Sequence, residues 1–187
     1  SKAVTGVLAF RLKEKGKIDL NKKTRDYESR LPAHHTHTVG QLLSNRGKVR
    51  HYLDNDPLSA GTTEVYASAY EATKLFSADP LVNKTYEYST HGYTCAAAAL
   101  EKKTGKTFSK LLQEEISTPF DVTTLRCENL AVNYDDRSKI YSASNNGTFS
   151  EITPKSLSWK FAGGGMESSA TDLARFGIRL LKGDIIS

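Results

Sequence analysis

The sequence has 187 residues, a length that fits one domain or a piece of a larger one. Its apolar share of 38% and charged share of 25% are ordinary for a globular domain. The net charge is +5, but acidic residues interrupt the densest basic stretch, Lys13 to Arg25, and no aromatic side chains interleave its lysines. These features argue against a nucleic-acid surface, and no apolar run approaches the roughly 20 residues that a membrane span needs.

Hydrophobic periodicity predicts helices early in the chain. Apolar residues recur at helical spacing from Ala3 to Leu12, and Gly16 is a typical C-terminal stop. Lys17 to Arg30 is polar and is expected to be irregular. The segment Thr38-Val39-Gly40-Gln41 has the spacing of a capping box, which predicts a short helix through Leu43.

Three further helices are expected in the middle of the sequence. The second of them contains the apolar run Ala96 to Leu100, which implies deep burial, and Gly105 ends it. The residue before a proline resists the helical conformation, so Asp79-Pro80 is expected to end the first of these three helices. The expected helices lie at residues 63–76, 89–103 and 107–116.

The last third has weaker signals until its final helix. Asn145-Asn146-Gly147 is a hairpin signal and predicts two short strands around it. Gly163 to Gly165 implies a tight backbone passage. Ser168 or Ser169 can cap a last helix, with an apolar face made of Leu173, Phe176, Leu180 and Leu181. Helices with so little strand predict a mainly α fold, in the form of a helical lobe.

Three places combine residue types that carry chemistry. The first is Lys2, at the start of the first helix. The second is the aromatic and hydroxyl cluster from Tyr86 to Tyr93, which enters the apolar helix. The third runs from Trp159 through the three glycines to Gly177.

With these segments in this order, the chain resembles the serine beta-lactamase and penicillin-binding-protein superfamily. It is similar to its class C beta-lactamase-like branch, and in particular to the beta-lactamase-like serine proteases related to the mitochondrial member. The likeness covers nearly the whole chain. It is carried by residues 41–44, 50–52, 71–81, 88–94, 162–165 and 172–177.

The resemblance implies a set of site residues. The family's nucleophile motif is Ser-x-x-Lys, so Lys2 matches its lysine and the serine would stand two positions before Ser1. In the family's Tyr-x-Asn motif, Tyr88 matches the tyrosine and Thr90 stands where asparagine is usual. A third motif, Lys-Thr-Gly or His-x-Gly, would follow the last helix. Lys2 and Tyr88 are therefore the expected catalytic residues, and Thr90, Gly163 and Gly164 the expected substrate-binding ones.

The chemistry explains the grouping of these residue types. A serine hydroxyl needs a nearby base to become a nucleophile at neutral pH. A lysine one helical turn later lies on the same helix face. A tyrosine opposite can relay the proton to the leaving group, and how the base role divides between the two stays open. With Thr90 in place of asparagine, the site lacks a side-chain amide that could bind a substrate amide. This difference favours peptides or esters over penicillins as substrates.

The resemblance implies a single partial domain over residues 1–187, from a parent of α+β type whose antiparallel sheet packs on this lobe. The expected function is a serine hydrolase that acts on small amides, peptides or esters, without a cofactor and inactive as this chain alone. Two alternatives stay open: a non-catalytic binding or assembly module, and a penicillin-binding regulator. If the parent's ends were lost, we expect Val4, Val7, Leu8 and Phe176 to be exposed, with pairing or self-association as the result. The compartment stays open, and a bacterial source would imply the periplasm or secretion.

Two further groups of side chains, the clustered histidines and the two cysteines, could bind a metal ion or form a disulfide. His34, His35 and His37 form a dense group on a polar loop, without a supporting carboxylate or cysteine nearby, and we expect no metal site there. Cys95 lies in an apolar run and is expected to be a buried small hydrophobe. Whether Cys95 and Cys127 form a disulfide stays open.

Overall fold

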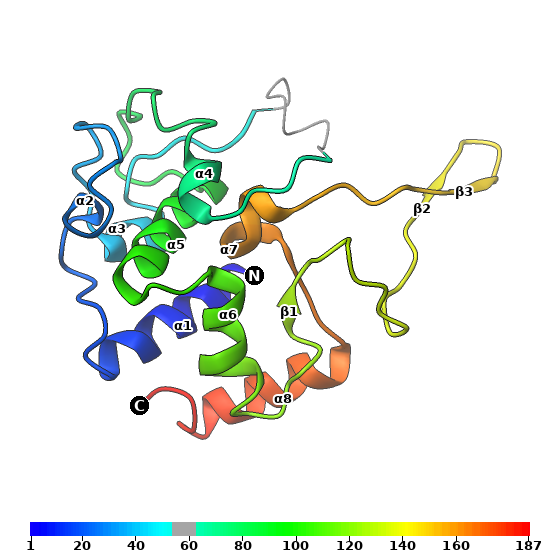
Figure 1. The fold of residues 1–187 in the computed structure, drawn as a ribbon. Helices are drawn as coiled ribbons and strands as arrows, with labels where there is room; N and C mark the ends of the chain where they lie inside the picture. The colour runs from blue at the N-terminus through cyan, green and yellow to red at the C-terminus, as the bar shows by residue number, and fades with distance from the viewer. Residues whose placement is uncertain (54–62) are drawn as a thin grey trace.

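The structure, a computed structural model, describes residues 1–53 and 63–187 (Figure 1). Helices dominate it, and α5 lies in their middle. A π-helix, η1 (Gln113–Ser117), continues α6, and a 3₁₀ helix, η2 (Ser158–Lys160), leads into α7. In the part of the chain described, no helix combines the length and apolar character needed to cross a bilayer. The α-helices are α1 (Lys2–Glu14), α2 (Thr24–Tyr27), α3 (Val39–Leu43), α4 (Ala69–Thr73), α5 (Thr90–Thr104), α6 (Phe108–Leu112), α7 (Phe161–Gly164) and α8 (Ala170–Leu181).

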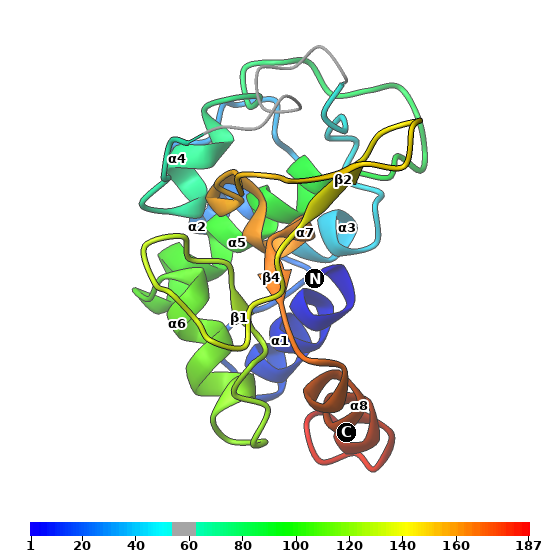
Figure 2. The same ribbon diagram turned by 90° about the vertical axis from the view of Figure 1, so that its right-hand side faces the viewer.

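The strands are short and form two antiparallel pairs. β1 (Arg126–Cys127) pairs with β4 (Met166–Glu167), so that Arg126 lies opposite Glu167. β2 (Tyr141–Ala143) pairs with β3 (Phe149–Glu151) in a hairpin that reaches away from the helices (Figures 1 and 2). Gly147 in its turn has φ of +83°, as the Asn-Gly signal predicted. The mainly α fold with a predicted hairpin is confirmed.

Helix α5 is the centre of the core, and local sequence signals define both of its ends. Ser89 caps it, because its Oγ accepts the Gly92 N–H at 2.8 Å. Gly105 ends it in the left-handed conformation, with φ of +69°. The small side chains from Ala96 to Ala99 are fully or almost fully buried, which lets α3, α4 and α7 pack closely around this helix.

Helix α1 packs its apolar face on this core. Val4, Val7 and Leu8 are 8% exposed or less, and Phe176 of α8 is buried as well. The expectation that these four residues would form an exposed face is therefore wrong. They belong instead to one buried apolar cluster with other residues of the lobe, including Ile185 near the end of the chain.

Other predicted helices differ from the structure in length. The only helix within residues 63–76 is α4, which begins after its N-cap Ser68. The residues before Ser68 have no regular secondary structure, and Val65 among them is 74% exposed. The polar stretch at 17–30, expected to be irregular, contains the short helix α2. The helix capped by Thr107 is α6, which passes into η1.

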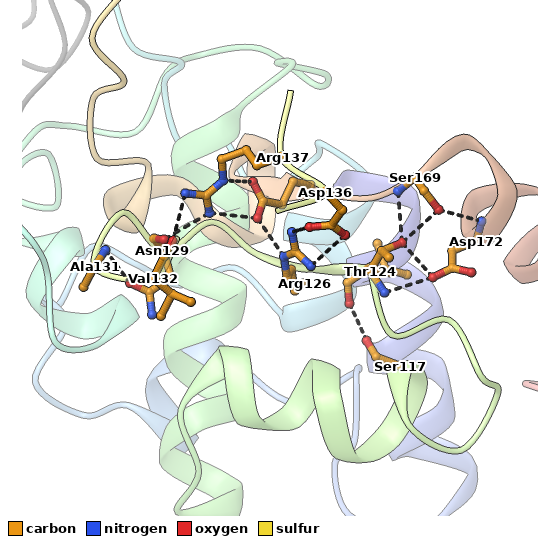
Figure 3. Close-up of polar contacts among 12 residues, drawn as sticks. Ser117, Thr124, Arg126, Asn129, Ala131, Val132, Asp136, Arg137, Ser169 and Asp172 are labelled. Atoms are coloured by element: carbon orange, nitrogen blue, oxygen red, sulfur yellow. Dashed lines mark hydrogen bonds and ion pairs between the residues drawn. The ribbon is translucent and has the colours of Figure 1, made fainter. Parts of the chain in front are cut away.

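Helix α8 is capped by Ser169, whose Oγ accepts the Asp172 N–H. Its predicted apolar face is buried only in part: Phe176 is buried, whereas Leu173 and Leu181 are exposed. The Asp172 carboxylate accepts two hydrogen bonds from Thr124, from its N–H at 2.9 Å and its hydroxyl at 2.6 Å (Figure 3). These bonds attach the start of α8 to the segment that leads into β1.

The two cysteines are separate, free and buried thiols. Cys95 lies inside α5, where burial raises its pKa far above the ordinary value. Burial also raises the pKa of Cys127 to about 12. The expectation for Cys95 as a buried small hydrophobe is confirmed, and the structure contains no disulfide between the two.

Candidate functional site

Lys2 joins three helices through its side chain. The residue occupies the first turn of α1, and its Nζ donates to the Gly163 carbonyl of α7 at 2.6 Å. The same Nζ donates to the Thr90 hydroxyl of α5 at 3.1 Å. A lysine ammonium has three donors and no acceptor, so these two contacts leave one donor position for a further group.

Two tyrosine rings lie beside the Lys2 ammonium. Its Nζ is 4.5 Å from the ring centroid of Tyr88 and 5.5 Å from that of Tyr93. Both distances are within the range of cation–π attraction. Tyr93 is buried and donates its hydroxyl to the Leu43 carbonyl at 2.6 Å, whereas Tyr88 is 50% exposed. Tyr88 is therefore the tyrosine of the two that is open to solvent.

The loop that follows α3 holds the segment from Tyr88 to Thr90 in place. The Ser89 N–H donates to Asn45 Oδ1, and the Ser89 hydroxyl donates to the Arg50 carbonyl at 2.8 Å. The Thr90 N–H donates to His51 Nδ1 at 3.2 Å, and the His51 ring meets the Tyr88 ring edge-on. Ser89, which caps α5, is thus also bonded to the loop that follows α3. His51 contacts both neighbours of Ser89.

Gly163 is required by the close approach of α7 to α5. A Cβ at this position would lie 2.6 Å from Thr90 Cγ2 and 3.0 Å from the Thr90 carbonyl oxygen. A Cβ on Gly164 would meet only the Lys160 side chain, at an ordinary 3.7 Å. The structure thus brings Lys2, Thr90 and Gly163 together, and places Gly164 beside Lys160.

A second amine lies near the first. Lys160 is half-buried, and burial lowers its pKa, with a further lowering from the charge of Lys2. Its Nζ lies over the Trp159 ring at 4.9 Å and near the Tyr52 ring at 5.6 Å. The site therefore has two cations close enough to repel each other, framed by aromatic rings.

Sequence reasoning missed Lys160 and a contact of Ser1, and it gave His51 only a structural or site-rim role. The Ser1 hydroxyl accepts the Met166 N–H at 3.2 Å, which attaches the start of α1 to β4. His51 and Lys160 each lay in segments already singled out, Arg50-His51-Tyr52 and the run from Trp159. Their roles depend on contacts with distant parts of the chain, which periodicity does not reveal.

The histidine group forms a hydrogen-bonded chain. His37 Nδ1 is 3.0 Å from the Thr24 hydroxyl, His37 Nε2 is 2.9 Å from His35 Nδ1, and His35 Nε2 is 2.9 Å from the Ser77 carbonyl. Burial lowers the pKa of His35. Burial and the electrostatic effect of His35 together lower the pKa of His37 to about 3. Among the described residues, no group of three or more histidine, cysteine or acidic side chains is arranged to hold a metal ion.

Comparison with known proteins assigns the family. A family model described as Beta-lactamase matches residues 1–187. The chain is 32% identical over 123 residues to the mouse (Mus musculus) serine beta-lactamase-like protein LACTB, mitochondrial, a match over 64% of this chain that spans only 22% of the relative.

Solved structures agree with this assignment. A D-stereospecific amidohydrolase from Streptomyces sp. covers the whole chain with a TM-score of 0.82 and 20% identity, over 60% of its own length. The penicillin binding protein from Bacillus halodurans does so with a TM-score of 0.81 and 15% identity, also over 60% of its length. They confirm the predicted beta-lactamase/transpeptidase-like fold. Because the family model matches every residue, the chain belongs to the beta-lactamase family.

Proposed function

We propose that the protein containing this chain is a serine hydrolase that forms and then hydrolyses an acyl–serine intermediate. The observation that carries this proposal is the convergence on the Lys2 ammonium of the Thr90 hydroxyl, the Gly163 carbonyl and the Tyr88 ring. A structural lysine at a helix start is usually solvated. Here three separate segments hold the amine in one position, as proton transfer requires.

In the proposed reaction, the nucleophile is a serine one helical turn before Lys2. Its hydroxyl loses a proton to Lys2 or to Tyr88 as its oxygen bonds to the substrate carbonyl carbon. The bond from that carbon to the leaving amine or alcohol then breaks, and the leaving group takes the proton back. Water, deprotonated by the same groups, cleaves the acyl–serine ester and restores the serine.

We propose small amides, peptides or esters as substrates. Thr90 offers a single hydroxyl, which already accepts from Lys2, where an asparagine would offer an amide. The site therefore has less capacity to bind the amide side chain of a penicillin. The structural neighbour named as a D-stereospecific amidohydrolase has the same fold, which is compatible with amide substrates.

The test is the intact mass of the whole protein before and after exposure to a fluorophosphonate, which labels activated serines. We expect one adduct, and we expect Lys2→Ala to abolish it. Lys13→Ala is the matched control, because it removes an exposed lysine from the same helix. Absence of an adduct, together with no turnover of esters, peptides or beta-lactams, would contradict the proposal and favour a non-catalytic binding or assembly module. A stable penicillin adduct without turnover would favour a penicillin-binding regulator.

A further inference from the structure

Glu128 has a buried carboxylate oxygen without a hydrogen-bond partner in the described part of the chain. The residue follows β1 and is only 9% exposed. Its Oε2 accepts the Leu157 N–H at 3.2 Å, but Oε1 has no such partner among the described residues. A buried acceptor left unpaired is costly, and in native proteins it calls for an explanation such as a ligand.

Glu128 lines a groove large enough for a small molecule. The groove has a volume of about 580 Å³, which falls within the range of small-molecule sites. Apolar side chains from four segments line it, and most of the lining surface is apolar. They are Leu130, Ile140, Ile152, Leu157 and Met166.

The arginines of the groove are already engaged by acidic partners (Figure 3). Arg126 makes two hydrogen bonds to the Asp136 carboxylate and one to Glu167 at 2.8 Å. Arg137 makes two hydrogen bonds to the same Glu167 carboxylate, at 3.0 and 2.9 Å. These pairs neutralise both guanidinium groups, so the buried polar atom left without a partner among the described lining residues is an acceptor, Glu128 Oε1.

The groove adjoins the candidate site through one strand. The Glu128 N–H donates to the Gly165 carbonyl at 2.9 Å. The next residue along, Met166, donates its N–H to the Ser1 hydroxyl and also lines the groove. Glu128 and the start of α1 are thus attached to consecutive residues of the same short segment.

We propose that this groove binds the amino end of an amine-bearing substrate, with its ammonium group on Glu128 Oε1 and its apolar body along Ile140, Ile152 and Met166. The substrate class would be amides, esters or peptides with a free amino terminus. The identification of the ligand as substrate rests on the proposed function. The binding of an apolar amine does not, because it needs no reaction.

Burial raises the pKa of Glu128, and the neighbouring Glu167 charge raises it further, whereas the Leu157 N–H and Arg137 lower it. An ammonium ion placed on Oε1 would supply the missing hydrogen bond and a compensating charge. Such an interaction is stronger than a neutral hydrogen bond, because donor and acceptor are both ionised.

The test is calorimetric titration of the whole protein with phenethylamine and with 2-phenylethanol, at pH 7.5. The two probes have similar shapes, neither can be hydrolysed, and only the first is a cation. We expect phenethylamine to bind at least 10-fold more tightly. We expect Glu128→Gln to remove that preference, because the amide still accepts the Leu157 N–H but no longer carries the charge.

Glu151→Gln is the matched control, because it removes one exposed carboxylate from the adjacent hairpin. It should leave the preference unchanged, and circular dichroism should give native spectra for both variants. Equal affinity for the two probes, no binding of either, or an unchanged preference in Glu128→Gln would overturn the proposal. Since no turnover is measured, failure of this test is distinct from failure to label the serine.

Discussion

Lys2 and Thr90 are 88 positions apart, and the Lys2 Nζ donates to the Thr90 hydroxyl at 3.1 Å. The contact joins the first turns of α1 and α5, at the point where α7 approaches both. In the proposed hydrolase this hydroxyl is an acceptor that orients the amine. Its removal should therefore affect the chemistry of the site more than the stability of the fold.

We predict that Thr90→Val lowers the rate of fluorophosphonate labelling by about 10- to 100-fold, the loss expected when an orienting hydrogen bond to a charged group is removed. Valine keeps the shape of threonine but cannot accept from Lys2. Thr90→Ser is the matched control and should retain most of the rate. The measurement is the labelling rate constant by intact mass, with thermal unfolding to verify the fold. Equal rates for the valine and serine variants would contradict this role.

The contact of α7 with α5 gives a prediction on stability. Gly163→Ala should lower the free energy of unfolding by about 1–3 kcal/mol, because the added methyl group overlaps Thr90 and forces the helices apart. Gly177→Ala, in a helix position with nothing within 4 Å, should instead raise it by up to about 1 kcal/mol. Urea unfolding of both variants tests the pair. An unchanged stability in Gly163→Ala would mean that α7 shifts freely.

The parts of the fold that could be predicted are those with local signals. Ser89, the alanine run and Gly105 define α5 without reference to other segments, and the capping box of Thr38 and Gln41 defines α3 in the same way. The helix expected at residues 63–76 failed because Val65 fitted a helical period, while the Ser68 cap decided where the helix begins.

The candidate site could be predicted only through resemblance. Spacing places Lys2 on a helix, but nothing local says that Thr90 and Gly163 meet its amine. The sequence of the polar loop with His35 and His37 raised only the question of a metal site and did not predict burial. Its burial depends on partners from distant segments, Thr24 and Ser77, which no periodicity could identify.

The ionised carboxylate of Glu115, in η1, is predicted to stabilise the fold. Burial alone would raise its pKa, but hydrogen bonds from Lys15 and Lys17 lower it below the ordinary value. We predict that Glu115→Gln lowers the free energy of unfolding by about 1–2 kcal/mol, since two partly exposed ammonium groups lose an ionised acceptor. Glu114→Gln, at an exposed ion pair with Lys106, should change it much less, because solvent screens an exposed pair. Urea unfolding at pH 7 measures both, and equal effects would contradict the assignment.

The buried histidine pair predicts acid sensitivity. The Ser77 carbonyl requires a proton on His35 Nε2, so His35 Nδ1 accepts from His37 Nε2, and His37 Nδ1 accepts from Thr24. A second proton on either ring would remove an acceptor from this chain, in agreement with the lowered pKa of both groups. Both rings must therefore be neutral in the folded state.

Because the folded-state pKa values are below the ordinary value of 6.5, the unfolded chain binds more protons in acid. The folded state therefore has its full stability with respect to these histidines above about pH 6.5. It loses that stability as the pH falls from there toward the pKa of His37, about 3. Within that window each histidine should lower the free energy of unfolding by up to about 1.4 kcal/mol per pH unit. Urea unfolding between pH 7.5 and 4.5 measures this slope. His37→Gln should reduce it and His34→Gln, outside the chain of hydrogen bonds, should not; an equal slope in all three proteins would place the acid-sensitive groups elsewhere.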